Sequence, residues 1–131
     1  MTTIRRATRQ DADACVAVLA SLPDYFTPDT HAELRAALEE HPCWVALDGE
    51  TVTGFVLAES RYPSSAEIPF AAVVPEQHRR GIGARLVAHA LEHLRAQGVA
   101  LVEVKTLDES SGYEPYVATR AFWERMGFVQ V

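Results

Sequence analysis

The segment from His78 to Ala84, His-Arg-Arg-Gly-Ile-Gly-Ala, has the residue types and spacing of an anion-binding turn. Glycine at positions 81 and 83 lets a backbone come close to an anion, and a helix that starts there points the positive end of its dipole at the same place. Arg79 and Arg80 add side chains that bind anionic oxygens. The segment therefore predicts a strand-to-helix turn that binds a diphosphate, with an ordinary tight turn as the alternative.

Two common nucleotide-binding motifs do not fit this turn. A P-loop ends in Gly-Lys-Ser/Thr, and no such ending follows Gly83. A dinucleotide fingerprint needs a third glycine where this chain has Leu86, and an acidic residue about 20 residues further on, near which Glu103 lies. The missing glycine counts against the dinucleotide interpretation.

The segment His89-Ala-Leu-Glu92-His93 matches the His-x-x-Glu-His pattern of a zinc peptidase family. On a helical wheel, however, apolar residues occupy the buried arc of this helix, both histidines fall at its margin, and Glu92 faces away. The sequence offers no third ligand. A solvated helix shoulder with no metal is the preferred interpretation.

Hydrophobic periodicity and turn residues divide the chain into alternating elements. Asp48-Gly49 predicts a hairpin turn and 62–65 a polar loop, while Gly98 and Gly127 end helices. The fold class is α/β (α+β): a mixed sheet with helices on both faces, in which strands 68–74 and 99–107 are parallel neighbours across a right-handed crossover. The predicted strands are 2–7, 43–47, 52–58, 68–74, a fully buried 99–107 and a short one after Gly127; the predicted helices begin at Gln10 and at Thr27, and span 81–97 and 116–126.

Length and composition point to one domain, residues 1–131, with an ordinary apolar content. A net charge of −6 argues against nucleic-acid binding and suits a cationic or amine substrate. No apolar run is long enough for a membrane span, and charged residues near the start exclude a signal peptide. Cys15 and Cys43 lack CxxC spacing, so two buried free thiols and a cytoplasmic location are expected.

Two segments of the chain resemble the Gcn5-related N-acetyltransferase (GNAT) superfamily. The stretch 73–87 contains that family's coenzyme A-binding pattern, Arg/Gln-x-x-Gly-x-Gly/Ala, with His78 at the usual Arg/Gln position. The stretch 119–128 is similar to the family's last helix and its Gly-Phe exit into a strand. Together with the element order, the resemblance covers nearly the whole chain.

The resemblance implies a central mixed sheet flanked by helices, in which a splayed strand pair binds acetyl-CoA. Backbone groups of Ala72, Val73 and Val74 would pair with the pantetheine arm. The pyrophosphate would be held by the backbone N–H groups of Arg79, Arg80, Gly81, Ile82, Gly83 and Ala84.

Trp123 also belongs to the implied coenzyme site, and it departs from the family pattern. It stands where many relatives have a tyrosine that protonates the departing thiolate. An indole N–H donates a hydrogen bond but is not a usable acid at neutral pH. The departure puts the acid of the reaction in doubt.

Acetyl transfer to an amine needs a group that removes the amine's proton, and Glu67 is the candidate base. The stretch 66–73 resembles a strand of the histone-acetylating branch, whose catalytic glutamate falls at Glu67. Regular alternation places Glu67 on one face with Pro69 and Ala71, in apolar surroundings; a solvated carboxylate is the alternative. Tyr116, seven residues before Trp123 on the predicted helix, is the candidate acid, with a helix-capping role as the alternative.

The predicted activity is acetyl transfer from acetyl-CoA to a primary amine by direct attack in a ternary complex. A small-molecule amine is preferred over a protein acceptor. The acceptor side has four candidate residues, Tyr25, Phe26, Arg61 and Tyr62. The alternative function is a non-catalytic acyl-CoA-binding module, which the tryptophan at position 123 makes credible.

The chain stops at Val131, four residues after Gly127, where the resemblance implies two strands. A missing strand would leave an unpaired sheet edge, which isolated monomers avoid. The sequence therefore predicts a homodimer that covers this edge, or a chain shorter than the natural one.

Overall fold

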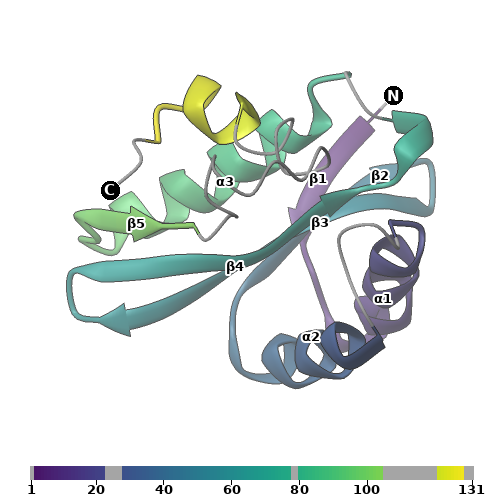
Figure 1. The fold of residues 1–131 in the computed structure, drawn as a ribbon, viewed down its shortest axis with the longest axis horizontal. Helices are drawn as coiled ribbons and strands as arrows, with labels where there is room; N and C mark the ends of the chain where they lie inside the picture. The colour runs from purple at the N-terminus through teal and green to yellow at the C-terminus, as the bar shows by residue number, and fades with distance from the viewer. Residues whose placement is uncertain (1, 23–27, 78–79, 105–120, 129–131) are drawn as a thin grey trace, which may run out of the picture.

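A mixed five-stranded sheet forms the centre of the computed structural model, which describes residues 2–22, 28–77, 80–104 and 121–128 (Figure 1). The first four strands are antiparallel neighbours in chain order, and the fifth lies parallel to the fourth. The predicted mixed sheet and its parallel crossover pair are confirmed. The strands are β1 (Thr2–Arg6), β2 (Cys43–Asp48), β3 (Thr51–Tyr62), β4 (Ser65–Val73) and β5 (Leu101–Glu103).

Helices cover both faces of this sheet, as predicted. Figure 1 shows α1 and α2 on one side, and α3 with the helical residues 121–125 on the other. No helix in the described stretches is long and apolar enough to cross a membrane. The helices are η1 (Arg9–Asp11), α1 (Ala12–Ala20), α2 (Pro28–Glu40), η2 (Pro75–Gln77) and α3 (Ile82–Ala96).

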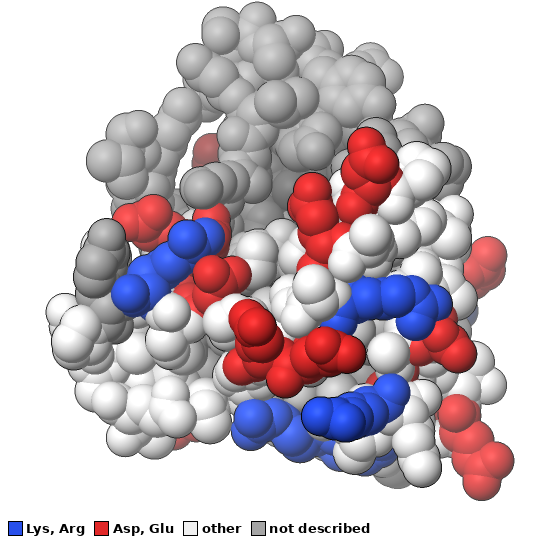
Figure 2. All heavy atoms as spheres, turned by 90° about the horizontal axis from the view of Figure 1, so that it is seen from below, with Lys and Arg blue, Asp and Glu red and all other residues white. Residues whose placement is uncertain are grey.

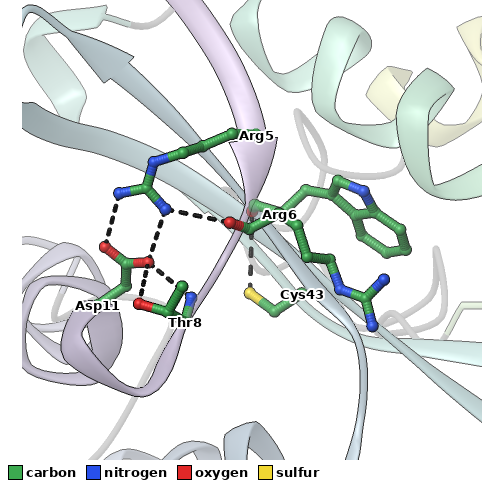
Figure 3. Close-up of polar contacts among 6 residues, drawn as sticks. Arg5, Arg6, Thr8, Asp11 and Cys43 are labelled. Atoms are coloured by element: carbon green, nitrogen blue, oxygen red, sulfur yellow. Dashed lines mark hydrogen bonds and ion pairs between the residues drawn. The ribbon is translucent and has the colours of Figure 1, made fainter.

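The Asp11 carboxylate fixes the entry from β1 into α1 (Figure 3). It accepts two hydrogen bonds from the Arg5 guanidinium, at 2.8 and 3.0 Å, and one from the Thr8 N–H at 2.7 Å. The Arg5 hydrogen bonds, followed by that from Thr8, lower the pKa of Asp11, although partial burial opposes the shift. An acidic group at a helix start also complements the helix dipole.

Two apolar clusters, one on each face, form the core. On the α1–α2 face, Leu34 of α2 is fully buried, and the free thiols of Cys15 and Cys43 are buried as predicted. Contact with Cys15 and burial raise the pKa of the Cys43 thiol. On the other face, α3 contributes Ile82, Leu86, Val87, Ala90 and Leu94, the stripe expected from its periodicity.

Gly54 of β3 lets α3 lie close to the sheet. A Cβ atom at this position would stand 2.9 Å from the carbonyl oxygen of Ala72 and 3.2 Å from Cδ1 of Leu86. Real side chains do not tolerate the first of these distances, so glycine is required by close approach. The start of α3 is thereby held against the end of β4.

Two predicted elements are wrong in extent. The polar loop at 62–65 is a tight turn at residues 63–64, because β3 and β4 both continue to the hairpin. Strand 99–107 is not fully buried over its described part: β5 spans only Leu101–Glu103, and Leu101 is 56% exposed. An apolar run does not distinguish a central strand from one that, within the described residues, pairs on one side only. Residues 105–107 lie outside the described part of the chain, and a single chain does not test the predicted homodimer.

Candidate active site

The start of α3 has the geometry of an anion-binding turn. Gly81 precedes the first helical residue with a φ of 77°, a left-handed conformation that favours glycine. Because glycine has no side chain, this position cannot cap the helix as serine or aspartate would. The N–H groups in the first turn of an α-helix have no acceptor within the helix, and an anion is a suitable partner for those from Ile82 to Ala84. Arg80 is exposed beside them, whereas Arg79 lies outside the described residues.

Gly83 has a packing role that the sequence did not reveal. A Cβ atom there would lie 3.3 Å from Cε1 of Phe122 and 3.8 Å from Cγ2 of Val73. The position must be small because the first turn of α3, the end of β4 and the C-terminal helix meet at it. The two sequence segments singled out by their motifs, far apart in the chain, are thus in contact.

Trp123 lies in the core on the α3 side and is 9% exposed. Its indole makes edge-to-face contacts with Phe122 and Phe128, at centroid distances of 5.0 and 5.1 Å. Gly127 ends the helix with a φ of 97°, as predicted. Tyr116, the candidate acid, lies outside the described residues, so its role stays a prediction.

The last residues of β4 lead directly to this turn. Ala72 is buried, Val73 and Val74 are half-buried, and the N–H of Val74 donates to the carbonyl oxygen of Thr53 at 2.8 Å. Over the described residues, β5 pairs with β4 only through the first three residues of β4. The segment assigned to the pantetheine arm therefore follows the part of β4 that β5 covers.

A β-bulge interrupts β4 between Glu67 and Phe70. Glu67 lies opposite Glu59 and Phe70 opposite Leu57, so two residues of β4 face the single residue between them on β3. One of the two is Pro69, whose missing N–H makes a bulge one of the few places a strand tolerates it.

The bulge overturns the predicted face for Glu67. Ala66 and Ile68, its neighbours, pack in the cluster on the α3 face, so the Glu67 side chain points to the α1–α2 face. Ala71, expected on the same face as Glu67, instead packs on the α3 face. Alternation predicts the wrong face because it holds only while the strand is regular.

Glu67 is buried and paired, so the alternative of a solvated carboxylate is wrong. It is 5% exposed, and its Oε2 accepts a hydrogen bond from Nη2 of Arg61. Nε of Arg61 also lies 3.5 Å from Oε1 of Glu59. The hydrogen bond with Glu67, followed by the charges of Glu67 and Glu59, raises the pKa of Arg61.

The ion pair depends on a second bulge. Ser60 lies opposite Ala66 and Tyr62 opposite Ser65, which leaves Arg61 as the extra residue of β3. The sequence predicts an acceptor-side position for Arg61 but not its partner, because a loop at 62–65 would conceal the hairpin register. A tight turn at 63–64, in place of the longer loop, brings the side chains of residues 59, 61 and 67 close together.

The remaining candidate residues from the sequence lie on α3 or outside the described part of the chain. His89 and Glu92 are exposed on α3, while the ring of His93 stands edge-to-face against Trp44 at 5.0 Å. Across the described parts of the chain, no group of three or more His, Cys, Asp or Glu side chains could hold a metal ion. The preferred interpretation of the His-x-x-Glu-His segment, a helix shoulder, agrees with this arrangement. Tyr25 and Phe26 lie outside the described residues.

Comparison with known proteins identifies the family. Residues 12–128 match the acetyltransferase (GNAT) family model. No curated protein matches the chain in sequence. A structure from Desulfovibrio desulfuricans, described as an acetyltransferase of the GNAT family, is 23% identical with a TM-score of 0.89, over 100% of this chain and 87% of that one.

Two further solved structures with lower identity have the same fold. AAC(6')-Iy, in complex with the bisubstrate analogue CoA-S-monomethyl-acetylneamine, is 16% identical with a TM-score of 0.76, over 99% of this chain and 92% of that one. The ribosomal-protein-alanine N-acetyltransferase from Brucella melitensis is 14% identical with a TM-score of 0.64, over 88% and 86%. Because the family model spans most of the chain and the fold agrees with it, the chain belongs to the GNAT family of acetyltransferases.

Proposed function

We propose that the protein transfers the acetyl group of acetyl-CoA to a primary amine, preferably of a small molecule, by direct attack in a ternary complex. The observation that carries the proposal is the junction at Gly83, where the start of α3, the end of β4 and the C-terminal helix meet. The two family motifs, distant in sequence, converge at one helix N-terminus, where Gly81 has a left-handed conformation and no side chain that could occupy the place of an anion.

In this proposal the coenzyme lies along the end of β4 with its diphosphate at the first turn of α3. Residues 79–84 would donate backbone N–H groups to the diphosphate, and Arg80 would add charge from the exposed side. Backbone groups of Ala72 and Val73 would pair with the pantetheine arm, whereas the N–H of Val74, also assigned to it from the sequence, already donates to Thr53. Trp123 would contribute to this site through packing, since its ring is held among Phe122 and Phe128.

The reaction requires a neutral amine at the thioester carbon. The C–N bond forms as the C–S bond breaks, the amine loses one proton and the leaving thiolate gains one. Glu67, buried on β4, would take the amine's proton directly or through water. Tyr116 would protonate the thiolate, a role that the indole of Trp123 cannot fill.

The charge of the β3–β4–β5 surface supports a cationic acceptor. Glu59, Glu67 and Glu103 lie side by side across three strands, and Arg61 is the basic residue paired among them. Figure 2 shows this side of the molecule, with acidic side chains flanking a basic one toward the left, where Figure 1 places the hairpin. An excess of carboxylates favours the approach of an ammonium group.

Calorimetry with acetyl-CoA followed by thiol release across a panel of primary amines tests the proposal. Saturable binding with amine-dependent release is expected, fastest with one class of small amine. Absence of binding would contradict both the enzyme and the binding-module functions.

A non-catalytic acyl-CoA-binding module is the second candidate, because Trp123 replaces the tyrosine expected of an acid and is packed in the core. Saturable binding of acetyl-CoA without thiol release for any amine would favour it. The panel should include small mono- and diamines as well as peptides with free N-termini or lysines, so that the acceptor class is decided in the same experiment.

A further inference from the structure

The ion pair between Arg61 and Glu67 joins an exposed cation to a buried carboxylate. The Arg61 side chain is 47% exposed and that of Glu67 only 6%. Arg61 is the extra residue of a bulge in β3, and Glu67 directly precedes the bulge in β4. Two irregularities on adjacent strands therefore bring the two groups together.

A carboxylate as buried as Glu67 is costly to keep ionised without a partner. Burial favours its protonated form, and an adjacent guanidinium favours the charged form. Arg61 is well suited to this role, because its guanidinium stays charged at every pH relevant to catalysis and can bind two carboxylates at once. Its Nε atom, 3.5 Å from Oε1 of Glu59, shows the second carboxylate in place.

Among the described residues, the elements that pack against β4 carry other charged groups, on β5, α1 and α3. Glu103 of β5 is the register partner of Glu67, is exposed, and adds to the charges that raise the pKa of Arg61. On α1, which also packs against β4, Asp13 pairs with Arg35 of α2 at 2.8 Å, and Cys15 is buried in the core. The titratable and charged residues of α3, which covers the opposite face, are Arg85, His89, Glu92, His93 and Arg95.

We propose that Arg61 is a positioning residue for acetyl transfer: its hydrogen bond keeps Glu67 ionised and oriented so that this carboxylate can accept the proton of the acceptor amine. The inference rests on the proposed function, in which Glu67 is the base. Arg61 itself exchanges no proton and forms no bond with either substrate. It acts through Glu67, and Glu59 holds the other side of its guanidinium.

Arg61 sets a balance between two requirements. Pairing makes Glu67 a weaker base but keeps it deprotonated, and loss of the pair makes it a stronger base that is ionised only at higher pH. Removal of Arg61 should therefore move the acid limb of the rate profile to higher pH and leave the rate at alkaline pH largely intact. A residue needed only for structure would lower the rate at every pH by the same factor.

The test measures kcat/KM against pH for the wild type, Arg61→Met, Arg61→Gln and Arg61→Lys, with one amine and saturating acetyl-CoA. Use of the same amine in all four proteins cancels the titration of the acceptor. In parallel, carboxyl NMR of 13C-labelled glutamate follows the protonation of Glu67, assigned by its loss in Glu67→Gln. This second measurement does not require activity.

We expect the Met and Gln variants to shift both the Glu67 titration and the acid limb upward by about 1–2 units, and the Lys variant to shift them by less than half as much. An unshifted Glu67 titration in the Met and Gln variants would overturn the inference. A shifted titration with an unmoved acid limb would also overturn it, because Glu67 would then not be the base. If the wild type releases no thiol, the proposed function fails, and the NMR titration alone still decides whether Arg61 governs the ionisation of Glu67.

Discussion

The start of α3 and the β3–β4 hairpin are built by different means. At the start of α3 the essential features are backbone conformation and close packing, the left-handed Gly81 and the crowded Gly83. At the hairpin they are side chains, Glu67 and Arg61, placed by two bulges. In the proposed function the first region binds the coenzyme through its main chain and requires small residues at positions 81 and 83, whereas the second depends on charged side chains and on register.

We expect the largest single effect on activity from a substitution in the β3–β4 hairpin. Glu67→Gln keeps the size of the side chain but removes the proposed base, so kcat/KM should fall by about 10²–10⁴-fold. Steady-state kinetics would show the loss. Calorimetry on the same variant should find acetyl-CoA affinity within about threefold of the wild type. A large loss of affinity would show that the two regions are not separable.

On the α3 side, Gly83→Val should weaken acetyl-CoA binding by about 10–100-fold and destabilise the fold by about 1–3 kcal/mol, because two methyl groups would collide with Phe122 and Val73. Titration calorimetry and urea unfolding measure the two effects. Gly83→Ala is the milder control: its Cβ meets the Phe122 ring at 3.3 Å, and better helix propensity offsets part of the strain. Equal affinity of the Val variant and the wild type would remove this junction from the binding site.

Away from both regions, Asp11 should affect stability and not catalysis. Asp11→Asn loses charge-assisted hydrogen bonds to Arg5 and Thr8, at a cost of about 1–3 kcal/mol. The pKa of Asp11 is lowered in the folded state, so its stabilisation is present above the unfolded pKa near about 4 and is lost as pH falls through the folded pKa.

Urea unfolding of wild type and Asp11→Asn between neutral and acidic pH checks this sign. The difference in unfolding free energy between the two proteins should shrink as the pH falls below the pKa of the Asp11 carboxyl in the unfolded state. A difference that stays constant over this range would show that the charge of Asp11 is not the source of the stabilisation.

The smallest effect comes from a matched pair at the two ends of α3. Gly81 and Gly98 have φ values of 77° and 86°, and among the described residues no atom lies within 4 Å of a Cβ added at either position. Alanine at either should cost about 1–2 kcal/mol of stability through backbone strain alone. Only Gly81→Ala should also lower acetyl-CoA affinity, by about 3–10-fold, because it distorts the turn. Equal affinities for both variants would indicate that the coenzyme does not use this end of the helix.

The two regions also differ in how far the sequence predicts them. Glycine at 81 and 83, apolar spacing along α3 and the Gly-Phe pair at 127–128 are local signals, and they predict the turn, the helix and its neighbour in the C-terminal segment. What Gly83 packs against is not local, so its contact with Phe122 had to come from the structure.

The hairpin depends on register, which a single sequence specifies weakly. Pro69 was a visible sign of a bulge in β4, but alternation without the bulge places Ala71 on the wrong face. The predicted extent and burial of β5 are wrong for a related reason: the exposed Leu101 is as apolar as a residue of a central strand. Pairing of Arg61 with Glu67 follows only once both bulges and the tight turn are known.

The central claim is that the first turn of α3 holds the diphosphate of the coenzyme. Backbone amide NMR of the labelled protein during titration with coenzyme A tests it most directly. The account predicts that the largest saturable shifts fall on the amides of residues 79–84 and of Val73 and Val74, while the Gly98 amide at the other end of α3 is little changed. Saturable binding that leaves the amides of Gly81, Ile82 and Gly83 unshifted would contradict it.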